Sequence, residues 1–99
     1  MPPTLADQVT ISREVLFQQV EGEAVLLDLA SETYFGLDEV GTRIWQLLQG
    51  HSRLRTVFES LRDEYDVEPE RLEQDLLKLI GELADAGLVI YGERYAAAP

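Results

Sequence analysis

Residues 22–48, GEAVLLDLASETYFGLDEVGTRIWQLL, decide the fold of this chain. Within them, residues 24–29 form a nearly continuous apolar run, whose short length favours a strand covered on both faces. Residues 33–37 contain two adjacent aromatic side chains and favour another strand. At Asp38 the apolar spacing becomes helical. The chain therefore passes from strand to helix with almost no linker, which places a sheet edge beside a helical layer. That arrangement suits the capture of an extended peptide better than it suits catalysis.

The residues before this stretch extend the sheet. Residues 15–20 are rich in β-forming side chains, and Gly22 can take a positive φ in the turn that follows them. Residues 1–14 show no steady period, so we expect a flexible arm or a weakly ordered strand there. The sequence thus predicts three consecutive strands.

Three helices are expected after the sheet. Asp38 is a good N-cap for the first helix, and Gly50 marks its end. Ser52 can cap the second helix, and Pro69 fits the first turn of the third. Gly87 ends the third helix, and a short fourth strand can follow it. This order predicts an α+β domain with a helix-turn-helix core and a small sheet, similar to a winged helix.

Composition restricts the function classes. The 99 residues suffice for one domain, and no apolar run approaches the ~20 residues that span a membrane. The N-terminus has no secretory signal, and the absence of cysteine excludes disulfides and thiolate metal sites, which fits a reducing cytoplasm. The net charge of −11 repels nucleic acids and anionic lipids and attracts a basic partner. Alternatively, the excess acid only keeps a small protein soluble.

Residues for catalysis or metal binding are scarce. His51 is the only histidine, and it falls at a turn between helices, where we expect it to face solvent. No serine has a base at a spacing typical of nucleophilic catalysis, and the acids lack calcium-loop spacing. Acidic residues of the third helix outnumber Arg71 and Lys78, which argues against DNA binding. We expect no catalytic residue, no metal, no cofactor, no nucleic acid and no membrane partner.

The third helix has an unusually wide apolar face. Its arc spans roughly 160°, against the ~100° stripe that one core contact requires. One flank can pack on the core while the other is left for a partner; alternatively, the first two helices wrap both flanks. The centre of the arc consists of Leu72, Leu76, Ile80 and Leu83, and Leu79 lies to one side of it, next to Asp75 and Glu82.

The aromatic strand, residues 33–37, has no charged side chain. If this strand lies at the edge of the sheet, its free backbone groups can pair with an extended peptide. Alternatively, Tyr34 and Phe35 belong to the core and the N-terminal arm blocks the edge. The residues alone leave both possibilities open.

Two stretches resemble a known family. Residues 22–50, GEAVLLDLASETYFGLDEVGTRIWQLLQG, look like the signature of PqqD-type proteins, the recognition elements for ribosomally made, modified peptides (RiPPs). Residues 76–89, LLKLIGELADAGLV, are similar to the end of the family's third helix. The resemblance covers about residues 15–90 and assigns residues 15–91 to a PqqD-like domain, with an arm at 1–14 and a tail at 92–99. The fold it implies is a winged helix-turn-helix with an N-terminal three-stranded antiparallel sheet followed by three helices.

The resemblance also implies a function. Members of this family bind the leader segment of a precursor peptide and present it to modifying enzymes. The leader is expected to add as a strand beside residues 33–37 and to pack against the third helix. The implied peptide-binding residues are Thr33, Tyr34, Phe35, Gly36, Leu37, Leu72, Asp75, Leu76, Leu79, Glu82 and Leu83.

Stand-alone members of this size occur in lasso-peptide pathways, where the partner is a separate leader peptidase. Others occur beside radical enzymes in the pathway to pyrroloquinoline quinone (PQQ). An apolar groove flanked by acids favours the lasso alternative. We therefore predict a non-catalytic, cytoplasmic adaptor that delivers a leader to a leader peptidase or another maturation enzyme. The alternatives are a PQQ-type peptide chaperone and an acidic winged-helix module with a regulatory role.

Overall fold

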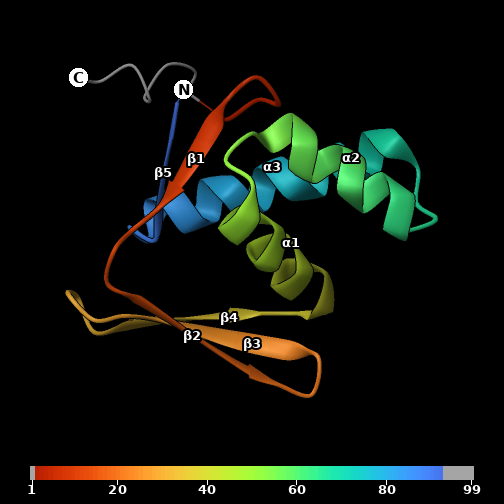
Figure 1. Ribbon diagram of the computed structural model, residues 1–99. Helices are drawn as coiled ribbons and strands as arrows, with labels where there is room; N and C mark the ends of the chain where they lie inside the picture. Colours follow the sequence, from red (N-terminus) through yellow and green to blue (C-terminus); the bar gives the residue numbers. More distant parts are fainter. Residues whose placement is uncertain (1, 93–99) are drawn as a thin grey trace.

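The computed structural model describes residues 2–92, which form two small sheets and three helices (Figure 1). A three-stranded antiparallel sheet lies on one side of the first helix, and a two-stranded ribbon lies beside the third helix. The sheet has the order β2-β3-β4, and the ribbon joins β1 to β5. The elements are β1 (Gln8–Ile11), β2 (Val15–Val20), β3 (Glu23–Asp28), β4 (Thr33–Leu37), α1 (Glu39–Gly50), α2 (Leu54–Glu64), α3 (Pro69–Asp85) and β5 (Val89–Gly92). The predicted α+β fold is confirmed, with its three-stranded antiparallel sheet followed by three helices; the winged-helix label stays a prediction.

The hairpin between β2 and β3 has the turn that its sequence predicts. Glu21 and Gly22 both have positive φ, of 51° and 86°. Two consecutive positive φ values match the right-handed twist of the flanking strands, and glycine adopts one of them without steric cost. The register that follows pairs Val20 with Glu23 and Leu16 with Leu27.

The central strand β3 is covered on one face only. Ala24 and Leu26 are buried beneath α1, but Val25 is 42% exposed. The prediction that both faces are covered is wrong, because α1 packs on one side of the sheet and no helix of residues 2–92 packs on the other (Figure 1). The apolar run therefore supplies a core face and an exposed face in alternation.

Asp28 and Ser31 shape the turn between β3 and β4. The Asp28 carboxylate accepts hydrogen bonds from the Ala30 N–H at 3.1 Å and from the Ser31 hydroxyl at 2.9 Å. Glu32, the next residue, has a positive φ of 59°. Aspartate commonly bonds to the backbone two residues ahead in such turns. These two polar residues of the family-like stretch therefore have a structural role, which is to start β4 in register.

The starts of α1 and α2 differ in how they are capped. The Asp38 carboxylate accepts the Gly41 N–H at 2.7 Å, which confirms Asp38 as the N-cap of α1. The prediction that Ser52 caps α2 is wrong, because α2 follows Arg53 and has no side-chain cap. The segment before α2 pairs with β1 instead: the Val9 N–H donates to the Ser52 carbonyl at 2.7 Å.

The first fourteen residues and the C-terminus meet in the ribbon. β1 lies within the segment expected to be a flexible arm or a weakly ordered strand, and its Val9 is buried. β5 pairs with it antiparallel, with Ile11 opposite Val89. α3 begins at Pro69 as predicted, and Gly87 follows its end with a φ of 81°. Of the predicted tail, only Gly92 is described, at the end of β5; the domain limits stay predictions.

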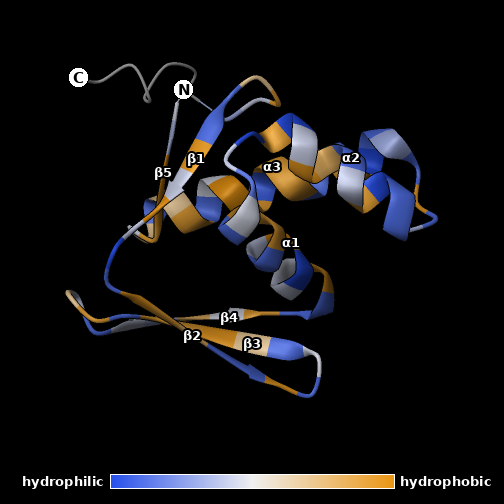
Figure 2. Ribbon diagram, in the orientation of Figure 1, coloured by the Kyte–Doolittle hydropathy of each residue, from blue (hydrophilic) through white to orange (hydrophobic). Residues whose placement is uncertain are grey.

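The core lies between the three helices and the inner face of the sheet. Fully buried side chains come from every helix, so the apolar stripes of the helices face inward (Figure 2). Each fully buried aliphatic or aromatic side chain contributes about 1.5–3 kcal/mol. Arg43 and Glu64 join α1 to α2 at the surface through hydrogen bonds of 2.8 and 2.7 Å. No helix within residues 2–92 is long and apolar enough to cross a membrane.

Candidate functional site

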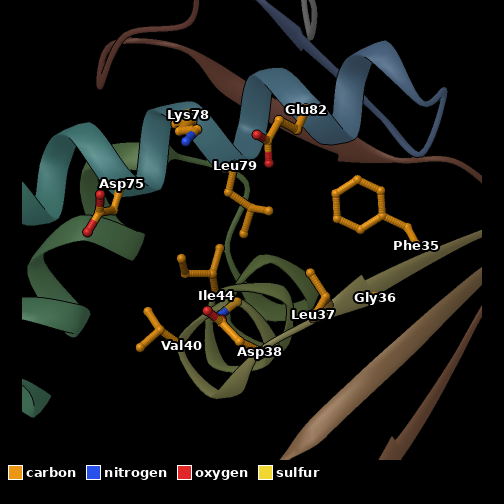
Figure 3. Close-up of a pocket in the computed structure, with 11 residues that line it drawn as sticks. Phe35, Gly36, Leu37, Asp38, Val40, Ile44, Asp75, Lys78, Leu79 and Glu82 are labelled. Carbon is orange, nitrogen blue, oxygen red and sulfur yellow. The ribbon is translucent and has the colours of Figure 1, made fainter.

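A groove of about 540 Å³ separates α3 from β4 and the start of α1 (Figure 3). One wall is β4 and the first turns of α1, which follow each other directly in the chain. The other wall is the middle of α3. The lining residues are Phe35, Gly36, Leu37, Asp38, Val40, Gly41, Ile44, Asp75, Lys78, Leu79 and Glu82.

The inside of the groove is apolar. Phe35 projects from β4 and Leu79 from α3, both half-buried, and Leu79 points toward Ile44 of α1 (Figure 3). Ile44 and Leu37 are nearly inaccessible, at 2% and 5% exposure, and form the base. Partly covered apolar side chains above a buried base make a slot that an aromatic or aliphatic side chain can enter without displacing the core.

The rim of the groove on α3 is charged. Asp75 and Glu82 supply carboxylates, and Lys78, the only lysine of the chain, lies between them. The Arg71 Nε lies 3.9 Å from the Asp75 Oδ2, and both side chains are well exposed, so this ion pair is weak. Within residues 2–92, Lys78 has no ion-pair partner within 4.0 Å. The rim therefore presents two acids and one free ammonium group.

The edge of β4 is open beside the groove. Within residues 2–92, β4 pairs with β3 only, and the N-terminal strand β1 pairs with β5, away from this edge. The alternative in which the arm blocks the edge is therefore wrong for the described part of the chain. Tyr34 is 70% exposed and is not a core residue, whereas Phe35 is half-buried and packs against the core. Gly36 alternates with Phe35 and Leu37 along β4, so a Cβ added there would point to the opposite face of the sheet, where it would meet no atom within 4 Å.

The structure divides the predicted site residues into three groups. Phe35, Gly36, Leu37, Asp75, Leu79 and Glu82 line the groove. Thr33 and Tyr34 lie at the exposed start of β4 and do not line it. Leu72, Leu76 and Leu83 are 3%, 0% and 0% exposed, so the structure places them in the core and not on an exposed peptide-binding surface. The centre of the wide apolar arc packs inward, and only its Leu79 flank is left open.

Five groove residues were missed by the sequence reasoning. They are Asp38, Val40, Gly41, Ile44 and Lys78. The sequence contained a signal for Val40 and Ile44. The first helix was expected to start directly after the aromatic strand, and residues 40 and 44 share one helix face. Lys78 lies about one helical turn from each of the two predicted acids, Asp75 and Glu82, so it shares their side of the helix. This spacing was the signal that could have identified it.

The groove has the features of a peptide-binding site. Within residues 2–92, no group of three or more His, Asp or Glu side chains could hold a metal ion. His51 is exposed at the end of α1, as predicted, and does not line the groove. An apolar slot beside an unpaired strand edge instead suits a peptide that contributes both backbone and side chains.

Comparison with known proteins agrees with this geometry. Residues 23–89 match the family described as coenzyme PQQ synthesis protein D (PqqD). The solved structure of TbiB1 in complex with the TbiA(beta) leader peptide is 39% identical, covers 81% of this chain and 93% of its own, and has a TM-score of 0.76. Lasso peptide synthetase B1 complexed with the leader peptide is 31% identical, covers 84% of this chain and 98% of its own, and has a TM-score of 0.72. No curated protein matches. The chain belongs to the PqqD family.

Proposed function

We propose that this chain is a non-catalytic adaptor that binds the leader segment of a ribosomally made precursor peptide. The observation that carries the proposal is the position of the open β4 edge, which faces the Leu79 flank of α3 across an apolar groove. The two similar solved structures support it, because both are complexes with a leader peptide.

Binding proceeds by strand addition in this proposal. The leader pairs its backbone with the free groups of β4, which supplies affinity without regard to sequence. Alternate side chains of an added strand point to the same face of the sheet, so every second leader residue turns toward the groove. An aromatic or aliphatic residue there packs between Phe35 and Leu79 and gains about 25 cal/mol per Å² of apolar surface buried.

The rim adds a preference for charge. Asp75 and Glu82 favour leader residues with basic side chains, and Lys78 favours an acidic side chain between them. Exposed ion pairs contribute little each, on the order of 0.2–1 kcal/mol, so they select among leaders rather than provide most of the affinity. The groove residues Phe35 and Leu79 are the main anchors.

The remaining predicted residues take indirect roles in the proposal. Thr33 and Tyr34 lengthen the strand edge beyond the groove, so they contact the leader through their backbone. Leu72, Leu76 and Leu83 lie under the open flank of α3 and hold it in place from the core.

The adaptor passes the leader to a separate leader peptidase or to another maturation enzyme. A lasso-peptide pathway is favoured over a PQQ pathway, because a lasso peptide synthetase B1 is 31% identical and covers most of the chain. The PQQ alternative stands on the family description.

Fluorescence polarisation with labelled peptides tests the proposal. Leader peptides encoded near this gene should bind, and the core segments of the same precursors should not. Failure of every leader to bind would overturn the adaptor role and favour an acidic regulatory module. Equal binding of leader and core segments would also contradict it, because strand addition at a shaped groove requires the leader's anchor residues.

A further inference from the structure

A second surface of the sheet is largely apolar, apart from Gln18 and Glu23, and no helix or strand of residues 2–92 covers it. It is the face of β2, β3 and β4 that points away from α1, here called the outer face. Leu16, Leu27 and Tyr34 lie opposite one another across the three strands and form one row of it. Leu16 is 53% and Tyr34 is 70% exposed. Val20 and Val25 continue the patch at 59% and 42% exposure.

The surroundings of the outer face carry one sign of charge. Residues 14–42 contain no Lys or Arg, and all their charged side chains are acidic. Glu21 and Glu23 lie at the hairpin end beside Val20, and Glu32 lies in the turn at the opposite end, all exposed. Exposed apolar side chains bordered by charged ones are a feature of interaction surfaces.

The charge also selects the partner. Two copies of this chain would bring acidic borders together, and each carries a net charge of −11, so self-association on this face is disfavoured. Nucleic acids and anionic membranes are repelled for the same reason. A folded protein with an apolar contact face bordered by Lys and Arg is complementary to the outer face in hydrophobicity and in charge.

We propose that the outer face docks such a protein, and that it is the enzyme that receives the leader; this identification rests on the proposed function. β4 then serves two contacts at once. Its inner side chains Phe35 and Leu37 belong to the groove, whereas Tyr34 and Gly36 alternate with them and face outward. The enzyme is held beside the bound leader without occupying the groove.

The size of the face predicts a transient contact. Three strands spaced ~4.8 Å apart and about six residues long give an area of roughly 14 by 20 Å. This is roughly 280 Å² per partner, below the ~800 Å² per partner of a standard specific interface, so the contact is expected to be weak and transient. An adaptor that hands over its cargo and is used again needs a contact of this kind.

The double variant Leu16→Lys/Val20→Lys tests the proposal. Both residues lie on β2, the sheet edge opposite β4, so the leader groove is left intact. The matched control is Ile90→Lys, which changes an equally exposed apolar residue (62%) on β5, outside the outer face. The probe is the purified leader peptidase or other maturation enzyme encoded beside this gene, and its affinity is measured by biolayer interferometry. The double variant should weaken enzyme binding about tenfold or more, while the control binds as the unmodified chain does.

Three results would overturn the proposal. The enzyme binds the unmodified chain and the double variant equally, or it binds neither, or sedimentation shows that the unmodified chain forms a dimer that the double variant dissociates. Leader affinity is measured separately by fluorescence polarisation on the same proteins. If the unmodified chain does not bind the leader, the proposed function is refuted. Normal leader binding with unchanged enzyme binding refutes only the docking surface.

Discussion

Leu79 of α3 and Phe35 of β4 line opposite walls of one groove, with Ile44 of α1 at its base. Neither wall is complete alone, because β4 supplies a free backbone edge and α3 supplies the partly covered apolar flank. A peptide that satisfies both walls must be extended and must carry an apolar side chain toward α3. This requirement underlies the first prediction.

Leu79→Glu should weaken leader binding by about tenfold or more, because it places a charge in an apolar slot that binding desolvates. The domain should stay folded, since Leu79 is half-buried and not part of the fully buried core. Fluorescence polarisation gives the affinity, and the fluorescence of buried Trp45 follows the melt. Val67→Glu is the control, at a position 42% exposed outside the groove. Unchanged affinity, or loss of a cooperative melt, would remove Leu79 from the site.

Asp75→Asn/Glu82→Gln should weaken the binding of a leader with basic residues about two- to tenfold at low salt, because the neutral amides keep the size of the carboxylates and remove their charge. The unmodified chain should lose affinity as salt rises, and the double variant should respond less. Lys78→Gln is the opposite control and should not weaken a basic leader. A flat salt response in the unmodified chain would assign the acidic rim to solubility alone.

Gly36→Ala should raise the free energy of unfolding by about 0.5–1 kcal/mol, because alanine loses less conformational entropy than glycine within a strand. The added Cβ meets no atom within 4 Å, so no clash opposes this gain. Urea unfolding measures the change. Leader affinity should remain, since the new methyl group points to the outer face and not along the strand edge. A decrease in stability would show that the backbone at this position requires glycine.

Glu64→Gln should destabilise the chain by less than ~1 kcal/mol at neutral pH, because both side chains of the Arg43–Glu64 pair are more than a third exposed, at 38% and 35%. The hydrogen bond from Arg43 and its positive charge lower the pKa of Glu64 below its ordinary value of 4.5. A lowered pKa in the folded state means that the pair stabilises the fold above pH 4.5 and that this contribution is lost as the pH falls through the folded pKa. Urea unfolding of both proteins at neutral pH and at about pH 3 should show the difference shrink. A difference that does not depend on pH would contradict the ion pair.

Asp38→Ala and Ser52→Ala should differ in their effects, although both residues are good caps by type. Asp38→Ala should lower the free energy of unfolding by about 0.5–2 kcal/mol, because the Gly41 N–H loses its acceptor. Ser52→Ala should change stability by less than about 0.5 kcal/mol, since α2 has no side-chain cap. Thermal melts of the two variants compare them directly. Equal destabilisation would mean that Ser52 caps α2 in solution.

Some features of this chain follow from the sequence by itself. The bounds of β2 and β4, the cap at Asp38, the turn at Gly22 and the start of α3 at Pro69 all agree with the local pattern. Each of these features depends on backbone preferences and on hydrogen bonds between near neighbours in the chain. The local sequence is therefore enough to predict them. The resemblance to the PqqD family also rested on local stretches of this kind.

Tertiary structure alone decided how apolar residues divide between core and groove. Residues 76 and 79 are both leucines of α3, yet Leu76 is fully buried and Leu79 lines the groove. Ser52 is no cap because Val9, far along the chain, donates to its carbonyl. Val25 is exposed because α1 covers one face of the sheet only. In each case the outcome depends on which distant element packs against the residue, and hydrophobic burial is non-directional, so periodicity marks an apolar side chain without naming its partner.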